Sequence, residues 1–184
     1  MNTATVPTGV LIHPLTPHTD SRGTLTEIYR ESWGLGCRPV QLNAVSSAAG
    51  VLRGVHVHAR HVDQICVVAG RMVLGLHDIR PTSMAARTSC LIDLDAADPH
   101  TVIIPIGVAH GFYFPEPSTM VYAVSEYWRA EDELACRWNS PELGLPWPTH
   151  APMLSERDAV ADDYATFVAM FRRARAEHAE RQDQ

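Results

Sequence analysis

The chain has 184 residues, of which 46% are hydrophobic and 20% charged, and its formal net charge is -6. This length and composition are typical of one soluble globular domain with a full core, so we expect a single domain over residues 1–184. No apolar run approaches the roughly 20 residues that span a bilayer, and an acidic chain without a basic cluster argues against nucleic-acid binding. We therefore expect neither a membrane nor a nucleic acid as partner.

Most of the chain consists of short runs rich in Val, Ile, Leu and aromatic residues, separated by Gly, Pro, Asp or Ser. Such runs indicate strands, and several in succession are typical of a β-sandwich or barrel. We expect strands at residues 25–29, 40–45, 64–68, 72–78, 90–94, 101–104, 111–114 and 120–125. Gly70 separates two of these runs and predicts a tight hairpin turn at residues 69–71.

The last part of the chain has a different pattern. Between residues 159 and 180 apolar side chains, including Tyr164, Phe167 and Phe171, recur at helical spacing. This period predicts a C-terminal helix over residues 159–184 that packs on the barrel or on a partner subunit. The Pro-rich stretch before it, residues 141–152, is interpreted as an ordered connection and not as a domain linker.

Two features of the composition limit the chemistry. All 15 basic residues are arginine, so no lysine can form a Schiff base or stabilise an enolate. The cysteines are far apart and form no CxxC pair: Cys37, Cys66, Cys90 and Cys136. The first residues lack the basic and apolar segments of a secretory signal. We therefore expect reduced, mostly buried thiols in a cytoplasmic protein.

A histidine-rich segment predicts a metal site. His56 and His58 are two residues apart, so on a β-strand both imidazoles lie on the same face. Asp63 follows them, and His110 occupies a second motif further along. Three imidazoles and one carboxylate suit an open site for one divalent transition metal such as Zn, Fe, Ni or Mn.

These two segments resemble known family motifs. Residues 50–63 with Gly70, and residues 105–112, are similar to the two cupin motifs, with Asp63 in place of the usual glutamate and Phe114 in place of a final asparagine. The resemblance implies an all-β fold, the cupin double-stranded β-helix or jelly roll, followed here by the C-terminal α-helix.

Seven short motifs carry a second resemblance. They are DSRG at 20–23, QLN at 41–43, LRGVH at 52–56, AHGF at 109–112, VY at 121–122, WP at 147–148 and LSERD at 154–158. In order and spacing they resemble the dTDP-4-dehydrorhamnose 3,5-epimerase family over about residues 16–158. The resemblance implies a nucleotide-sugar isomerase that acts beside the C4 ketone of an NDP-4-keto-6-deoxyhexose.

The same resemblance implies the catalytic residues. His56 corresponds to the general base, Asp158 to the carboxylate that fixes its tautomer, and Tyr122 to the acid that returns a proton from the opposite face of the sugar. Inversion at a carbon requires two groups, because the proton leaves from one face and arrives at the other.

Further positions match the family's substrate contacts. They are Arg22, Glu27, Gln41, Asn43, Arg53, His110 and Trp128. Arginine forks suit a diphosphate. Two departures concern the substrate side: Leu25 replaces the aromatic residue that stacks on the thymine, and Trp128 replaces the tyrosine of a Tyr-x-Pro motif. The resemblance also implies a homodimer, in which the Arg22 segment reaches into the neighbour's site.

One departure opens an alternative function. The family places a lysine near the developing enolate, where this chain has Asp63. Either another donor, such as His110 or Arg60, stabilises the oxyanion, or Asp63 holds a metal that acts as a Lewis acid. If His56 is a ligand it cannot also be the free base. The alternatives are a metal-dependent cupin isomerase, cyclase or oxygenase of a secondary pathway, and a non-catalytic metabolite-binding cupin.

The remaining histidines are interpreted as ordinary surface or loop residues: His13, His18, His61, His77, His100, His150 and His178. Among them, His61 is closest in sequence to the predicted metal site.

Overall fold

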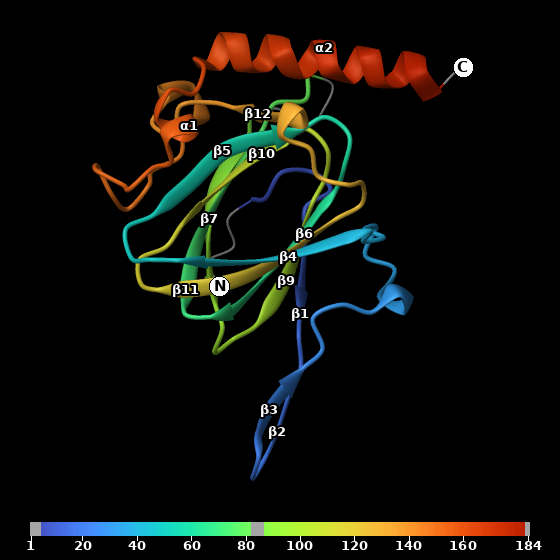
Figure 1. Cartoon of the computed structure of the whole chain (residues 1–184), viewed down its shortest axis with the longest axis vertical. Helices are drawn as coiled ribbons and strands as arrows, with labels where there is room; N and C mark the ends of the chain where they lie inside the picture. Colours follow the sequence, from blue (N-terminus) through green and yellow to red (C-terminus); the bar gives the residue numbers. More distant parts are fainter. Residues whose placement is uncertain (1–4, 82–86, 183–184) are drawn as a thin grey trace.

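Two antiparallel five-stranded β-sheets pack face to face and form the body of the protein (Figure 1). The computed structural model describes residues 5–81 and 87–182, so the two ends of the expected domain, residues 1–4 and 183–184, lie outside the described residues. The architecture is the predicted jelly roll with a C-terminal helix.

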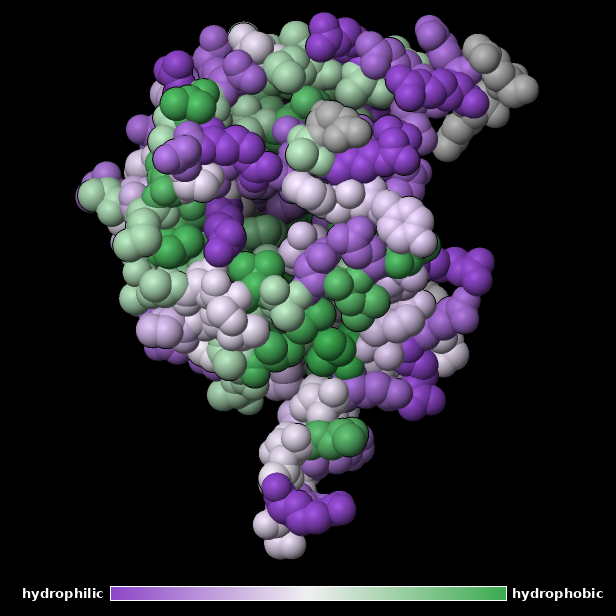
Figure 2. Space-filling view, in the orientation of Figure 1, coloured by the Kyte–Doolittle hydropathy of each residue, from purple (hydrophilic) through white to green (hydrophobic). Residues whose placement is uncertain are grey.

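The first sheet carries the strand that follows the histidine-rich segment. Its strands in spatial order are β1 (Leu11–Pro14), β9 (His100–Ile104), β6 (Asp63–Ala69), β11 (Ser118–Val124) and β4 (Gln41–Ser47). Within β11, Tyr122 lies opposite Ile65 on one side and Asn43 on the other. A separate hairpin of β2 (Pro17–Asp20) and β3 (Gly23–Thr26) projects from the body, as Figures 1 and 2 show.

The second sheet carries the three histidines predicted for the site, His56, His58 and His110. Its strands in spatial order are β12 (Glu133–Ala135), β5 (Leu52–His58), β10 (Val108–Tyr113), β7 (Arg71–Asp78) and β8 (Ser89–Asp95). His110 on β10 lies directly opposite His56 on β5, so the two imidazoles leave the sheet on the same face. Short 3-10 helices occur at Glu31–Trp33, Ala130–Asp132 and Pro141–Leu143.

The core has two parts because the second sheet is covered on both faces. Alternate residues of β7, such as Leu74 and Leu76, are fully buried in the cluster between the sheets. The opposite face of β7 is covered by the predicted ordered connection, whose Trp147 packs so closely on Gly75 that a Cβ at this glycine would clash with the indole. Burial on both faces explains why residues 72–76 form a continuous run without a polar side chain.

The turn at Gly70 is not the predicted hairpin. β6 ends at Ala69 and β7 begins at Arg71, but β6 pairs with β9 and β11, whereas β7 pairs with β8 and β10. The turn therefore carries the chain from one sheet to the other. Gly70 has a φ of 73°, and a Cβ there would clash with the side chain of Ser118. Only glycine suits this position.

The predicted strand at residues 25–29 is also corrected. β3 covers Gly23–Thr26 and pairs only with β2, where Pro17 stands opposite Thr26. Proline has no N–H to continue the ladder, and no further strand lies beside residues 27–30 in the described part of the chain. The strand therefore ends before Glu27.

The C-terminal helix begins later than its sequence pattern predicts. α1 (Glu156–Ala159) is a separate single turn, and α2 (Tyr164–Gln182) is the long helix. Asp163 accepts a hydrogen bond from the backbone N–H of Thr166 at 2.8 Å, which is the contact of an N-cap and fixes the start of α2. No helix in residues 5–81 or 87–182 is long and apolar enough to cross a membrane.

Two aromatic residues attach α2 to the second sheet, which it crosses at one end (Figure 1). Phe167 and Phe171 are buried in a cluster with Val57 and Leu134, as the helical spacing predicts. Burying each ring contributes about 1.5–3 kcal/mol relative to leaving it exposed.

His77 was expected at the surface, but it is buried beneath α2. Its Nδ1 is 2.7 Å from the Ser89 hydroxyl, and its Nε2 is 2.8 Å from the Tyr164 hydroxyl at the start of α2. The sequence interpretation was wrong because the partners of His77, Ser89 and Tyr164, are 12 and 87 residues away along the chain.

This burial predicts an acid-sensitive stability. Burial lowers the pKa of His77 from its ordinary 6.5, although Asp78 partly opposes the shift. Below about pH 6.5 the unfolded chain therefore binds a proton that the folded chain resists. We expect the free energy of unfolding to decrease as the pH falls from 6.5 towards the lowered pKa, by at most about 1.4 kcal/mol per pH unit.

Urea unfolding at a series of pH values measures this slope. His77→Gln should flatten the pH dependence in that window, whereas His150→Gln, at an exposed position, should leave it unchanged. Equal slopes in His77→Gln and the unaltered protein would contradict the assignment.

Candidate active site

A cavity of about 530 Å³ opens between the two sheets. Side chains from β4, β5, β6, β10, β11 and β12 line it, together with Met153, Leu154, Ser155, Arg157 and Asp158. Several predicted site residues meet there: His56, His58, Asp63, His110, Tyr122, Arg53, Trp128 and Asp158. The predicted catalytic residues and part of the predicted substrate-binding positions thus line one cavity.

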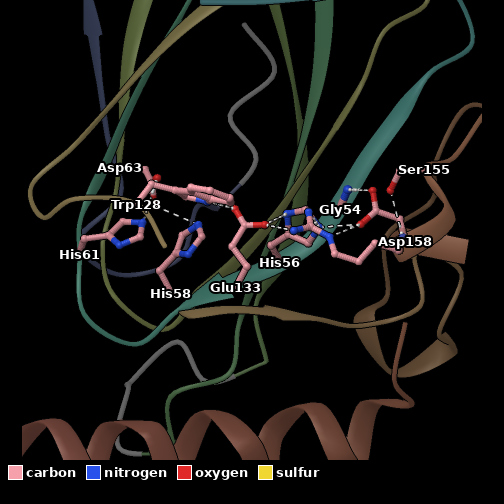
Figure 3. Close-up of polar contacts among 10 residues, drawn as sticks. Gly54, His56, His58, His61, Asp63, Trp128, Glu133, Ser155 and Asp158 are labelled. Carbon is pink, nitrogen blue, oxygen red and sulfur yellow. Dashed lines mark hydrogen bonds and ion pairs between the residues drawn. The ribbon is translucent and has the colours of Figure 1, made fainter. Parts of the chain in front are cut away.

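The structure joins His56 and Asp158. His56 Nε2 and Asp158 Oδ1 are 2.8 Å apart, and both side chains are buried (Figure 3). Asp158 lies in α1, where Ser155 caps the helix by accepting a hydrogen bond from the N–H of Asp158 at 3.1 Å. The second carboxylate oxygen accepts from the N–H of Gly54. These contacts fix the carboxylate against the imidazole.

The charge on Asp158 determines the tautomer of His56. Burial opposes ionisation of this carboxyl, but the hydrogen bond and charge of His56 outweigh it and hold the pKa of Asp158 below its ordinary value. An ionised carboxylate can only accept, so the 2.8 Å contact with Asp158 favours a hydrogen on Nε2 of His56, against the weaker 3.3 Å contact of the same nitrogen with the Arg157 guanidinium, which can only donate. The unprotonated nitrogen is then Nδ1, which is the atom available to take a proton.

Tyr122 approaches the cavity from the other sheet. It lies on β11 of the first sheet, whereas His56 lies on β5 of the second, and both line the cavity. Burial raises the pKa of Tyr122, and the negative charges of Glu133 and Asp63 raise it further. The phenol therefore keeps its proton at neutral pH and can donate it.

Glu133 is a site residue that the sequence did not reveal. Its Oε2 is 4.0 Å from His56 Nδ1, and Arg157 forms an ion pair with the same oxygen at 2.5 Å. The indole N–H of Trp128 donates to Oε1 at 2.6 Å. Burial opposes ionisation, but His56 and this indole outweigh it, so the pKa of Glu133 is lowered. Trp128 thus contacts Glu133 as well as the cavity.

The predicted metal ligands are only partly brought together. In the described part of the chain, the side chains of His58, His61 and Asp63 form a group whose ligand atoms lie within 4.8 Å of one another. His56 instead binds Asp158 through Nε2, and His110 Nδ1 contacts the Val108 carbonyl at 3.1 Å. The ligand atoms that lie close together thus include His61, which the sequence analysis left out, whereas His56 and His110 have other partners (Figure 3).

His61 is buried and not a surface residue. It is 3% exposed, and its ring stacks on that of His58 with centroids 4.1 Å apart. The only sequence signal was its place two residues before Asp63. Burial lowers the pKa of His58 to about 3, which keeps this imidazole neutral, whereas the surrounding imidazoles outweigh burial at Asp63 and lower its pKa.

Of the positions predicted to bind the substrate, some line the cavity and others do not. Arg53 lines the cavity, and its Nε donates to Ser47 at 3.0 Å. On the edge strand β4, Gln41 accepts from the backbone N–H of Trp128 at 3.1 Å and donates to Asn43 at 3.0 Å. These two residues therefore lie beside the cavity and do not line it.

Arg22 and Glu27 belong to the projecting region. Arg22 is paired with Asp20 in the turn of the β2–β3 hairpin, and its side chain is 87% exposed. The guanidinium of Arg30 donates to both carboxylate oxygens of Glu27. Neither lines the cavity of its own chain among the described residues.

Comparison with known proteins identifies the family. The family model described as dTDP-4-dehydrorhamnose 3,5-epimerase matches residues 4–166. Two relatives with that name are the Neisseria gonorrhoeae protein, 32% identical over 155 residues, and the Pseudomonas aeruginosa protein, 34% identical over 155 residues. The alignments cover 80% and 79% of this chain, but 47% and 86% of the relatives, so the chain spans about half the length of the first.

A solved structure agrees with the sequence matches. The Legionella pneumophila dTDP-6-deoxy-D-glucose-3,5-epimerase RmlC, in complex with dTDP-4-keto-L-rhamnose, superposes with a TM-score of 0.79 at 28% identity. The superposition covers 90% of this chain and 95% of that one. With the family model matching residues 4–166, the chain belongs to the dTDP-4-dehydrorhamnose 3,5-epimerase family.

Proposed function

We propose that the protein is an epimerase of a dTDP-4-keto-6-deoxyhexose, inverting a carbon next to the C4 ketone. The observation that carries the proposal is the placement of the His56–Asp158 pair and Tyr122 on facing sheets across one cavity. A base on one side and a phenol on the other is the arrangement that inversion requires.

The proposed reaction consists of two proton transfers. His56 Nδ1 takes the proton from C3 or C5, and the electron pair of the broken C–H bond moves into an enolate with the C4 oxygen. Tyr122 then donates its proton to the opposite face of the same carbon, and the C4 ketone re-forms. The base and acid recover their starting states through solvent. Nothing is oxidised or reduced overall, so the atoms and electrons balance without a cofactor.

Asp158 and Glu133 prepare His56 for this step. Asp158 holds Nε2 at 2.8 Å, which leaves the Nδ1 lone pair free to accept the proton. Once His56 is protonated, the carboxylate of Glu133 at 4.0 Å from Nδ1 adds a second favourable charge. At this separation and partial burial such a pair contributes on the order of a few kcal/mol.

The nucleotide is proposed on two grounds. The Legionella pneumophila relative is described with a dTDP-sugar bound. In this chain Arg53 is fixed at the wall of the cavity by its contact with Ser47, where its guanidinium suits a diphosphate. Leu25 offers no aromatic face for the thymine, and a lost stacking contact costs about 1–3 kcal/mol. We therefore expect weaker discrimination among nucleotides.

A homodimer is proposed from the surface. The β2–β3 hairpin projects from the body (Figure 2). Leu25 on this hairpin is 68% exposed, and Leu42 on β4 is 59% exposed. A second copy of the chain would cover this edge strand and place Arg22 near the partner's cavity. Light scattering measures the oligomeric state, and a purely monomeric protein would contradict the proposal.

Two further points concern the cellular compartment and the alternative function. The four cysteines are free and buried, which supports a reducing compartment such as the cytoplasm. The alternative of a metal-dependent cupin enzyme of another class is not favoured, because His56 binds Asp158 and the relatives are named epimerases.

Solvent exchange tests the function directly. The protein is incubated with dTDP-4-keto-6-deoxyglucose in D₂O, and the sugar is analysed by mass spectrometry and NMR. We expect one deuterium per sugar if one carbon is inverted and two if both are. A family epimerase serves as positive control, and no incorporation under conditions where that control reacts would reject the proposal.

A further inference from the structure

We propose that His58, His61 and Asp63 bind one divalent transition-metal ion at the wall of the cavity. Two imidazoles and one carboxylate are the donor types that Zn²⁺, Fe²⁺ and Mn²⁺ take in proteins. This set differs from the one that the motif spacing predicts, because it includes His61 and leaves His56 outside.

The three side chains are close to the geometry of a shared ion. Asp63 Oδ2 is 3.8 Å from His58 Nε2, and Asp63 Oδ1 is 3.6 Å from His61 Nε2. Two atoms bound to one ion at about 2.1 Å lie roughly 3.0–3.5 Å apart. Small side-chain rotations therefore bring all three within coordination distance, and Figure 3 shows the three groups facing one another.

An unpartnered nitrogen of His61 independently indicates a ligand, whereas His58 faces Asp63 through Nε2 and not through its unpartnered Nδ1. His58 and His61 are 5% and 3% exposed, and the Nδ1 of His58 and the Nε2 of His61 have no hydrogen-bond partner within residues 5–81 and 87–182. A buried polar atom without a partner costs about 1–3 kcal/mol. Of these atoms, His61 Nε2 lies beside Asp63, where coordination would satisfy it.

An ion here would remain open to the cavity. His58 and Asp63 line the cavity wall together with His56 and Tyr122, whereas His61 lies behind them. Coordination positions on the cavity side would thus be free for water or for an oxygen of a bound molecule. One carboxylate and two neutral imidazoles also leave a divalent ion with a net positive charge.

The consequence for catalysis depends on the proposed function. Without a cation, the carboxylate of Asp63 would repel the enolate oxygen that forms beside it. The chain contains no lysine to oppose that charge. A divalent ion held by His58, His61 and Asp63 would reverse the sign of the local charge and would stabilise the enolate as a Lewis acid. His56 remains free to act as the base.

Metal binding is measured without substrate, on untagged full-length protein. The protein is stripped with a chelator and titrated with Co²⁺, whose visible absorption reports imidazole and carboxylate coordination, and the metal content is measured by elemental mass spectrometry. We expect about one ion per chain. Removing a residue that only supports a metal ligand lowers metal affinity by about 10–100-fold. His61 and Asp63 are proposed as direct ligands, so His61→Gln and Asp63→Asn should bind Co²⁺ more than about 100-fold more weakly.

Matched variants separate this set from the motif-based one. His100→Gln is the control, because His100 contacts the Asp98 carbonyl away from the cavity. His56→Gln and His110→Gln should keep the ion. Retention in His61→Gln with loss in His56→Gln or His110→Gln would overturn the proposal, as would an unaltered protein that binds no Co²⁺. If a variant fails to fold by circular dichroism, anomalous diffraction from the cobalt-loaded protein decides which side chains are ligands.

The outcome is independent of the epimerase assay. No ion together with deuterium exchange into the sugar rejects the metal site and keeps the proposed function. A stoichiometric ion at His58, His61 and Asp63 without any exchange keeps the metal site and rejects the function.

Discussion

Replacing His56 with asparagine is expected to lower kcat by about 10³–10⁴-fold, with little change in the affinity for dTDP. The change removes the nitrogen that takes the proton from the sugar, whereas Arg53 at the cavity wall is untouched. Product formation followed by NMR gives kcat, and calorimetry with dTDP gives the affinity. A variant with near-normal kcat would show that another group is the base.

Asp158→Asn tests the same pair from the other side. The amide of asparagine can donate to His56 Nε2 and so favour the tautomer with the hydrogen on Nδ1, which blocks the base. In a hydrolase triad the equivalent change costs about 10⁴-fold, so a loss of similar size is expected here. Asp162→Asn, an exposed neighbour in sequence, is the matched control. Similar activity in both variants would contradict the role of Asp158.

The contact between His56 and Asp158 was predictable from family motifs that follow one another in a fixed order along the chain. His56 and Asp158 are 102 residues apart, yet the structure places them in hydrogen-bond contact, as the family resemblance implies. Strands β4 and β6 to β11 and the apolar face of the C-terminal helix were also predictable, because each follows from the spacing of apolar residues in a short segment, whereas β1, β2, β5 and β12 were not among the expected runs.

Contacts that depend on pairing between distant strands were not predictable. Glu133 reaches His56 because β12 pairs with β5, so that Glu133 stands opposite His58. A three-residue strand with one acidic residue has no pattern that predicts its partner. The Gly70 turn was assigned to a hairpin for the same reason, since the spacing of apolar residues does not say which sheet a strand joins.

Buried histidines were misassigned for a related reason. His61 and His77 are 3% and 0% exposed, although histidine is common at surfaces. Their burial results from elements that cover them: His58 stacks on His61, and Tyr164 of α2 covers His77. Neither of these packing contacts can be predicted from the residues next to the two histidines in the sequence.

Tyr122→Phe is expected to separate proton exchange from inversion. The variant keeps the His56–Asp158 pair, so His56 can still remove a proton and return a deuteron to the same face of the sugar. The substitution removes only the phenolic O–H, whose raised pKa keeps it protonated at neutral pH. We expect deuterium in the sugar with unchanged configuration, while inversion slows by about 10²–10⁴-fold.

The two readouts come from one sample in D₂O, since mass spectrometry gives the deuterium content and NMR coupling constants give the configuration. Tyr113→Phe is the matched control, because Tyr113 packs against the cluster that contains Phe167 and Phe171 and does not line the cavity. If Tyr122→Phe inverts the sugar at the normal rate, the acid is another group. If exchange and inversion are lost together, Tyr122 is needed for proton removal itself, and the two-sided mechanism fails. Exchange without inversion would show that the two facing sheets supply the two opposite proton transfers.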